Sequence, residues 1–168
     1  WINQRKETNK EKERTNLLLV TFDQWRGDWG NPNAPIIKLP CLEKIAKDGW
    51  VAKRCYTSSP QCVPARLSWL TGVPPSRMGI TKNEPANLPG DAPSFIRDLK
   101  EKGWKTAIVG KTHWTDHSLR CDLRDNVNRL QSLGFMDTVE VAGPRALSKI
   151  KCALTQEWEN KGVYDIHM

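Results

Sequence analysis

Apolar residues along the chain gather in short runs that alternate between strand length and helical spacing. Residues 16–22 (NLLLVTF) form a continuous apolar run, which is typical of a central strand covered on both faces. Residues 105–109 (KTAIV) are a second run of this kind. Residues 50–56 and 138–141 are shorter strand candidates. Each of the two longer runs ends in polar residues, so we expect a polar cluster at the end of each strand.

Helical patterns separate these runs. In residues 39–48, Pro40 stands at the start and Gly49 follows the end, and these are the usual start and stop signals of a helix. Strands that alternate with helices predict an α/β fold, with a mostly parallel sheet flanked by helices. Further helices are predicted over residues 64–70, 94–102, 126–133 and 146–158, and surface loops over the proline-rich residues 73–75 and 85–93.

The composition is that of a folded globular chain with an excess of positive charge. Of 168 residues, 38% are hydrophobic and 27% are charged, and the formal net charge is +7. Within residues 1–15, a charged N-terminal arm, basic and acidic side chains alternate, which is typical of a solvated face. A phosphate-binding stripe would instead gather its positive charges, so we expect no nucleic-acid partner.

No apolar run reaches the roughly 18–20 residues that a membrane helix needs, so we expect no membrane partner. The first residues also carry no signal-peptide pattern, which makes a cytoplasmic location the default. The compartment nevertheless stays open, because the sequence begins at Trp1 and an export signal before it would not be seen.

The sharpest motif is the segment SPQCVPARLSWLTG over residues 59–72, which contains Cys62 and Arg66. The cysteine precedes a helix that begins with proline, so an anion at its side chain would face backbone N–H groups and the positive end of the helix dipole. Arg66 lies one turn further along and can point back to the same place. A lone cysteine is more often a buried packing residue, so the surrounding pattern carries the argument for chemistry.

A second polar cluster, Asp23-Gln24, directly follows residues 16–22. Its carboxylate and amide oxygens suit a hard cation such as Ca²⁺ or Mg²⁺, although an acidic residue after a strand is also a common strand cap.

A third cluster, Gly110-Lys111-Thr112-His113, follows residues 105–109. A nucleotide-binding P-loop would need glycine five residues before Gly110, where Lys105 stands, so that reading fails. Ligands of parallel sheets collect beyond the carboxyl ends of the strands, so we expect both clusters at one edge of the sheet. A lone histidine in such a place is more often structural.

In order and context, the three motifs resemble those of the type I sulfatases, which have the alkaline phosphatase-like fold. The resemblance covers roughly residues 16–116. It implies that a formylglycine-generating enzyme oxidises Cys62 to formylglycine, which acts as the nucleophile and as a ligand of the metal ion. It also implies that Asp23 and Gln24 hold Ca²⁺ (or Mg²⁺), and that Arg66, Lys111 and His113 support the reacting sulfate. The family usually has serine at position 65, where this chain has alanine.

The resemblance therefore implies a sulfuric ester hydrolase that cleaves a sulfate monoester, a small-molecule substrate. Residues 16–168 would be the N-terminal part of its catalytic domain, with an incomplete fold, because family members are much longer and their later half supplies further metal ligands. Two rivals stay open. One is a phosphonate monoester or phosphodiester hydrolase of the same superfamily, which shares Cys-x-Pro-Ala-Arg and an Asp-Gln-Trp-Arg opening. The other is an inactive, truncated sulfatase-like module. The Gly-Lys-x-His element favours sulfate over phosphonate.

Four further residues are weaker candidates. Asn83 lies in a segment that resembles the family's loop after the cysteine motif, where it either contacts substrate or shapes a turn. Trp25, Trp114 and His117 are candidates for the wall of a pocket, although tryptophans are mostly core residues or surface anchors.

Overall fold

The computed structural model describes residues 15–29, 37–84 and 86–167. The chain divides into two compact units, Trp1–Val51 and Ala52–Met168. The charged arm predicted for residues 1–15 lies outside the described residues except for Thr15. In the described part of the chain, no helix has both the length and the apolar character that a membrane crossing requires.

The first unit contains the helix α1 (Pro40–Asp48), as predicted for residues 39–48. The strand predicted for residues 16–22 is wrong: within the described residues this segment pairs with no strand, and Leu17, Leu18 and Leu19 are between 64% and 85% exposed. An apolar run favours extended backbone, but a strand forms only where a neighbouring strand supplies hydrogen-bond partners. Residues 50–56 likewise form no strand.

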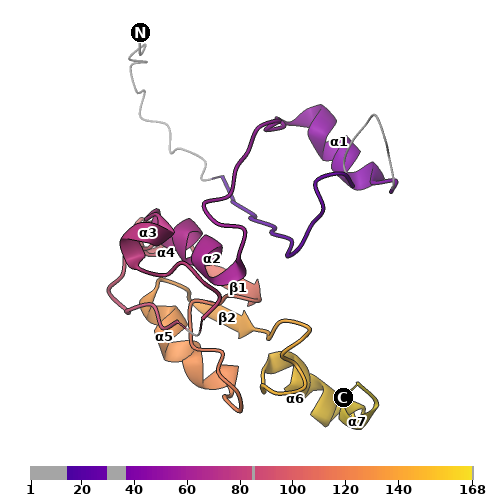
Figure 1. The fold of residues 1–168 in the computed structure, drawn as a ribbon, viewed down its shortest axis with the longest axis vertical. Coiled ribbons are helices and arrows are strands. Elements are labelled where there is room, and N and C mark those ends of the chain that lie inside the picture. The colour runs from indigo at the N-terminus through magenta and orange to yellow at the C-terminus, as the bar shows by residue number, and fades with distance from the viewer. Residues whose placement is uncertain (1–14, 30–36, 85, 168) are drawn as a thin grey trace. The chain divides into compact units, whose positions relative to one another are not determined.

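The second unit holds the sheet and the remaining described helices (Figure 1). In chain order the elements are α2 (Cys62–Thr71), α3 (Pro75–Met78), α4 (Phe95–Glu101), β1 (Ala107–Gly110), the 3₁₀ helix η1 (Leu123–Asn126), α5 (Val127–Ser132), β2 (Asp137–Glu140), α6 (Ala153–Asn160) and α7 (Tyr164–His167).

Most of these elements agree with the sequence prediction. Helices were correctly predicted at α2, α4 and α5 and strands at β1 and β2, with bounds that differ by a few residues. Helix α6 begins at Ala153 rather than near residue 146, because residues 144–149 form turns. The short helices α3 and α7 were not predicted.

Strands β1 and β2 pair in parallel, and their arrows point the same way in Figure 1. The chain returns between them through η1 and α5, which is the crossover that a parallel pair requires. This confirms the predicted α/β organisation, here as a small, two-stranded sheet. Gly110 is the register partner of Glu140, so the carboxyl ends of both strands meet at one edge. Any residue that follows Gly110 therefore lies beside the end of β2.

The main core of the second unit joins α2 to the segment after β1. The ring of Trp114 stacks on Phe135, with 5.4 Å between centroids and 12° between planes. Burial of each large apolar side chain contributes about 1.5–3 kcal/mol, so this contact fixes the chain just beyond β1. The buried members of the core are Val63, Leu67, Leu70, Leu88, Trp114, Leu130, Leu133 and Phe135.

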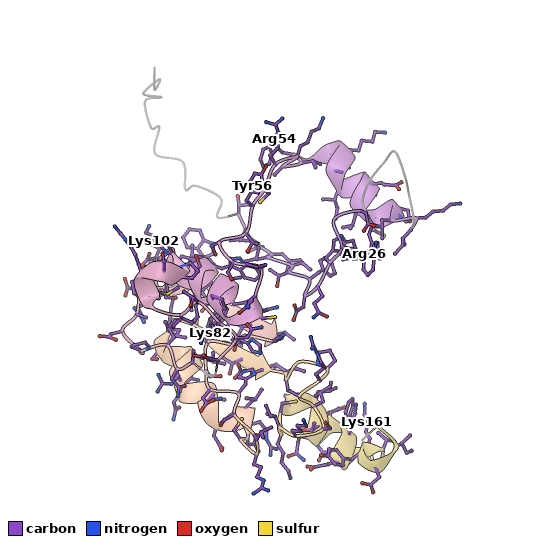
Figure 2. The ribbon with its side chains drawn as sticks, viewed as in Figure 1. Arg26, Arg54, Tyr56, Lys82, Lys102 and Lys161 are labelled. Carbon is purple, nitrogen blue, oxygen red and sulfur yellow. The ribbon has the colours of Figure 1, made fainter. Side chains whose placement is uncertain are left out.

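Positive side chains are spread over the surface of the second unit. Arg54, Lys82, Lys102 and Lys161 project at separate places in Figure 2. The Lys82 and Lys161 ammonium groups are also paired with carboxylates, those of Glu84 and Glu157.

Helix α4 is fixed against the corner between α5 and β2. The Ser94 hydroxyl accepts a hydrogen bond from Arg97 N–H at the start of α4 and donates one to the Leu133 carbonyl at 2.5 Å. Gly134 allows this close approach, because a Cβ at that position would lie 2.4 Å from the Arg97 backbone nitrogen. Its φ of +110° also lies in a region that L side chains rarely adopt.

Replacing Gly134 by alanine should therefore destabilise the second unit by roughly 3 kcal/mol or more, since the added methyl group meets backbone that cannot move aside. Gly162 is the matched control: its φ is +66°, but nothing lies within 4 Å of an added Cβ. Gly162→Ala should lose only about 1 kcal/mol, from the left-handed backbone alone. Urea unfolding followed by circular dichroism gives both values, and equal losses would contradict this account of the α4 contact.

Candidate active site

Cys62 is the first residue of α2, rather than the residue before the helix as predicted. Gln61 is the N-cap, with extended backbone, and Pro64 occupies the third helical position. Proline is tolerated there because the first-turn N–H groups have no partner within the helix. The Cys62 side chain is half-buried at this helix start. The thiol thus lies at the positive end of the helix dipole.

Asn83 caps this helix from a distance of 20 positions in the sequence. Its Oδ1 accepts a hydrogen bond of 2.9 Å from the Val63 backbone N–H, and the side chain of Gln61 makes no capping bond. This role as a helix cap is neither of the two predicted for Asn83, which were a substrate contact and a turn.

Arg66 connects α2 to the loop after β1. The arginine is buried, and its Nη1 donates a hydrogen bond of 2.5 Å to the carbonyl of Lys111. In return, the Trp114 indole Nε1 donates a hydrogen bond of 2.8 Å to the carbonyl of Arg66. These residues lie 45 and 48 positions apart in the sequence. The two bonds hold helix α2, here called the cysteine helix, beside residues 111–113, here called the Lys-Thr-His segment. Trp114 is buried and thus anchors this segment in the core, rather than lining a pocket.

Lys111 and His113 follow β1 at the edge where both strands end. The Lys111 side chain runs along Gly143, since a Cβ at Gly143 would lie 3.4 Å from the Lys111 Nζ. His113 has a φ of +59°, in the left-handed region. Non-glycine residues in this region store strain and are enriched at functional sites. The imidazole of His113 packs edge-on against that of His117, with 4.8 Å between ring centroids.

Glu140 is the site residue that the sequence patterns missed. It is the last residue of β2, it is 5% exposed, and its carboxylate accepts hydrogen bonds from Thr112, Thr115 and His117. Its only sequence signal was an acidic residue at the end of a predicted strand, which is common and points to no partner.

Asp23 and Gln24 belong to the first unit, whereas Arg66, Lys111, His113 and Cys62 belong to the second. Asp23 and Gln24 occupy an exposed turn, and the φ of Gln24 is +57°. Adjacent carboxylate and amide oxygens are donors that a hard cation such as Ca²⁺ accepts, so this pair fits one part of such a site. Within residues 15–29, 37–84 and 86–167, no three His, Cys, Asp or Glu side chains gather into a metal site.

Cys121 is a half-buried thiol beyond the Lys-Thr-His segment. Burial raises the pKa of the Cys121 thiol above its ordinary value, and the nearby Asp116 and Glu140 carboxylates raise it further. A thiol with a raised pKa stays protonated at neutral pH and is a poor nucleophile.

The strain at His113 should appear in a comparison of two substitutions. His113→Gly should be more stable than His113→Ala by about 1 kcal/mol, because both remove the imidazole but only alanine bears the left-handed backbone cost. Gln131, an exposed residue within α5, is the matched control, and there alanine should be more stable than glycine. Urea unfolding of the four variants measures these differences, and the same order at both positions would contradict strain at His113.

The cap provided by Asn83 should also be measurable. Asn83→Ala should lower the free energy of unfolding by about 1 kcal/mol, because the Val63 N–H loses its acceptor. Asn83→Asp keeps an oxygen in place and adds negative charge near the helix N-terminus, so it should retain wild-type stability. Thermal unfolding distinguishes the two variants, and an equal loss in both would show that the cap contributes nothing.

The chain is similar to known proteins over much of its length. A family model described as Sulfatase matches residues 15–168. A choline-sulfatase of Rhizobium meliloti is 33% identical over 102 residues, which are 60% of this chain and 20% of that protein. An ulvan-active sulfatase of Formosa agariphila is 32% identical over 112 residues, or 66% of this chain and 22% of that protein. A human steryl-sulfatase is 31% identical over 111 residues, or 60% and 19%.

The chain thus spans about a fifth of the length of these relatives. Its parallel sheet and flanking helices are a part of the alkaline phosphatase-like α/β fold that the family implies. The family model covers nearly the whole chain, including the cysteine helix, the Asp-Gln turn and the Lys-Thr-His segment, and this confirms the resemblance read from those motifs. The chain therefore belongs to the sulfatase family.

Proposed function

We propose that residues 16–168 are the N-terminal part of a sulfatase catalytic domain, and that the intact gene product hydrolyses a sulfate monoester. One observation carries the proposal. The Arg66 guanidinium donates a hydrogen bond to the Lys111 carbonyl, and the Trp114 indole donates one to the Arg66 carbonyl. These two bonds hold helix α2, which begins at Cys62, beside the segment that bears Lys111 and His113. A nucleophile, a cation and an imidazole on adjoining backbone are the groups that acyl- or sulfuryl-type transfer needs.

Residue 62 is the nucleophile in this proposal, after a formylglycine-generating enzyme has converted the cysteine to formylglycine. One hydroxyl of the hydrated aldehyde attacks sulfur and loses its proton, while the S–O bond to the alcohol breaks and the alcohol leaves with a proton. The second hydroxyl then loses its proton and re-forms the aldehyde C=O, as the C–O bond to the sulfate breaks and sulfate leaves. Two features of the chain support this role of residue 62. Cys62 is half-buried rather than sealed in the core, and it stands at a helix start where a transferred anion is stabilised.

Lys111 and His113 act on the reacting group. The Lys111 ammonium balances negative charge that develops on the sulfuryl oxygens, and the His113 imidazole holds or accepts the proton of the attacking hydroxyl. Arg66 donates a hydrogen bond to the backbone carbonyl of Lys111 and so fixes the point from which the lysine side chain extends. The net charge of +7 would favour the approach of an anionic substrate.

Asp23 and Gln24 would supply oxygen ligands to a divalent cation, Ca²⁺ or Mg²⁺, in the intact gene product. When bound, such an ion polarises the sulfate oxygens and orients the nucleophile. The donor chemistry of the Asp-Gln turn supports this assignment.

Phosphonate monoester or phosphodiester hydrolysis is the second candidate. The specific observation in its favour is the pair of motifs Cys-x-Pro-Ala-Arg and Asp-Gln-Trp-Arg, which occur here at positions 62–66 and 23–26. The Lys111-Thr112-His113 segment and the sulfatase names of the matched relatives favour the sulfate ester.

Cys62→Ala should abolish hydrolysis of 4-nitrophenyl sulfate by the intact gene product, with a loss of roughly 10³-fold or more, because the nucleophile is removed. Cys55→Ala, which changes an exposed thiol nearby, should retain wild-type turnover. Intact-mass analysis after coexpression with a formylglycine-generating enzyme should show that the wild type and Cys55→Ala have exchanged one sulfur and two hydrogens for one oxygen, and that Cys62→Ala has not.

The same proteins should be assayed with phenyl phosphonate monoesters. A higher kcat/KM for the phosphonate ester than for the sulfate ester would overturn the choice of substrate. An unmodified thiol and no turnover of either ester in the wild type would favour the inactive module.

A further inference from the structure

Glu140 is a buried carboxylate that none of the proposed catalytic steps uses. It ends β2, opposite Gly110 in the register, and it is 5% exposed. A carboxylate at this depth is costly unless several donors compensate it. The groups around the Glu140 carboxylate should therefore include donors that stabilise its charge.

Within the described residues, the hydrogen-bond donors of this carboxylate come from the segment directly after Lys111. The Thr112 hydroxyl and the His117 Nε2, at 2.9 Å, meet its Oε1. The Thr115 hydroxyl lies 3.1 Å from Oε1 and 3.3 Å from Oε2. An ionised carboxylate accepts at both oxygens and donates nothing, so three converging donors match its charged form. We call Thr112, Thr115, His117 and Glu140 the Glu140 cluster.

The Glu140 cluster touches the proposed catalytic pair from two sides. Thr112 stands between Lys111 and His113, and its hydroxyl also accepts a hydrogen bond of 3.3 Å from the Trp114 backbone N–H. His117, held by Glu140, packs its ring edge-on against His113. The backbone between the two catalytic residues and the ring of one of them are thus both tied to a single carboxylate.

The strained conformation of His113 needs such support. Its left-handed φ of +59° persists only where neighbouring contacts determine it, and residues 112, 114, 115 and 117 are held by the Glu140 cluster or by the core. Because charge-assisted hydrogen bonds are roughly twice as strong as neutral ones, an ionised carboxylate fixes the segment better than an amide would.

We propose that Glu140 is a positioning residue of the sulfatase reaction: through Thr112 and His117 it holds Lys111 and His113 in the conformation that the sulfuryl transfer requires. The inference rests on the proposed function. Glu140 itself does not touch the substrate, so its loss should lower the rate of the chemical step more than the affinity for the substrate.

The test compares Glu140→Gln and Thr112→Val with Thr112→Ser in the intact gene product, assayed on 4-nitrophenyl sulfate. Glu140→Gln keeps the shape but loses the charge, and Thr112→Val removes the hydroxyl that reaches Glu140. Both should lower kcat by roughly 10- to 100-fold, as expected for small misplacements of catalytic groups. Their KM should change by no more than about twofold, because binding is not affected. Thr112→Ser, which keeps a hydroxyl at this position, should retain most of the wild-type kcat. Glu101→Gln, an exposed glutamate on α4, is the matched control and should behave as the wild type.

An unchanged kcat in Glu140→Gln and Thr112→Val, or a loss of kcat in Thr112→Ser as large as in Thr112→Val, would overturn the inference. Amide hydrogen exchange separates this failure from a failure of the proposed function. If the wild type does not hydrolyse the sulfate ester, the proposed function fails. Exchange over residues 112–117 should still be faster in Glu140→Gln than in the wild type and Glu101→Gln, and equal exchange in the three proteins would reject Glu140 as the residue that fixes this segment.

Discussion

The site in the second unit depends on one reciprocal contact between the cysteine helix and the segment after β1. Arg66 donates from its guanidinium to the Lys111 carbonyl, and its own carbonyl accepts from the Trp114 indole. Both bonds are buried or partly buried, where an unpaired partner is costly. The bond from the charged guanidinium contributes about 1.5–3 kcal/mol, and the neutral bond from the indole about 0.5–1.5 kcal/mol. The stacking of Trp114 on Phe135 anchors the same segment in the core. Two motifs far apart in sequence thus become neighbours through a side chain from each of them.

The parallel pairing of β1 and β2 determines where the Lys-Thr-His segment lies relative to the end of β2. Since Gly110 and Glu140 are register partners, the residues that leave β1 pass directly over the end of β2. The buried carboxylate at that end then collects hydroxyl and imidazole donors from the passing segment. In this view Arg66 holds the start of the Lys-Thr-His segment, while Glu140 holds its middle and the chain beyond it. His113 is strained between these two attachments.

Local elements were predictable from sequence, and contacts between distant segments were not. The helix at Cys62 is specified by nearby proline and by Gly72, which has a φ of +69° at the helix end. Residues 16–22 show the limit of such reasoning, since their apolar character favours a strand but the described residues supply no pairing partner. The motifs named Arg66, Lys111 and His113 as candidates, but no spacing predicted that Arg66 would bind the Lys111 carbonyl. Glu140 escaped prediction for the same reason, because its significance comes from donors at least 23 positions away.

If residue 62, Lys111 and His113 bind one anion, a crystal structure of the intact gene product with bound sulfate should show all three on the same ion. We expect the sulfate to contact residue 62, the Lys111 Nζ and the His113 imidazole at the same time, with Arg66 still bonded to the Lys111 carbonyl. A sulfate ion that contacts residue 62 while Lys111 and His113 point away from it would show that the three residues do not form one site.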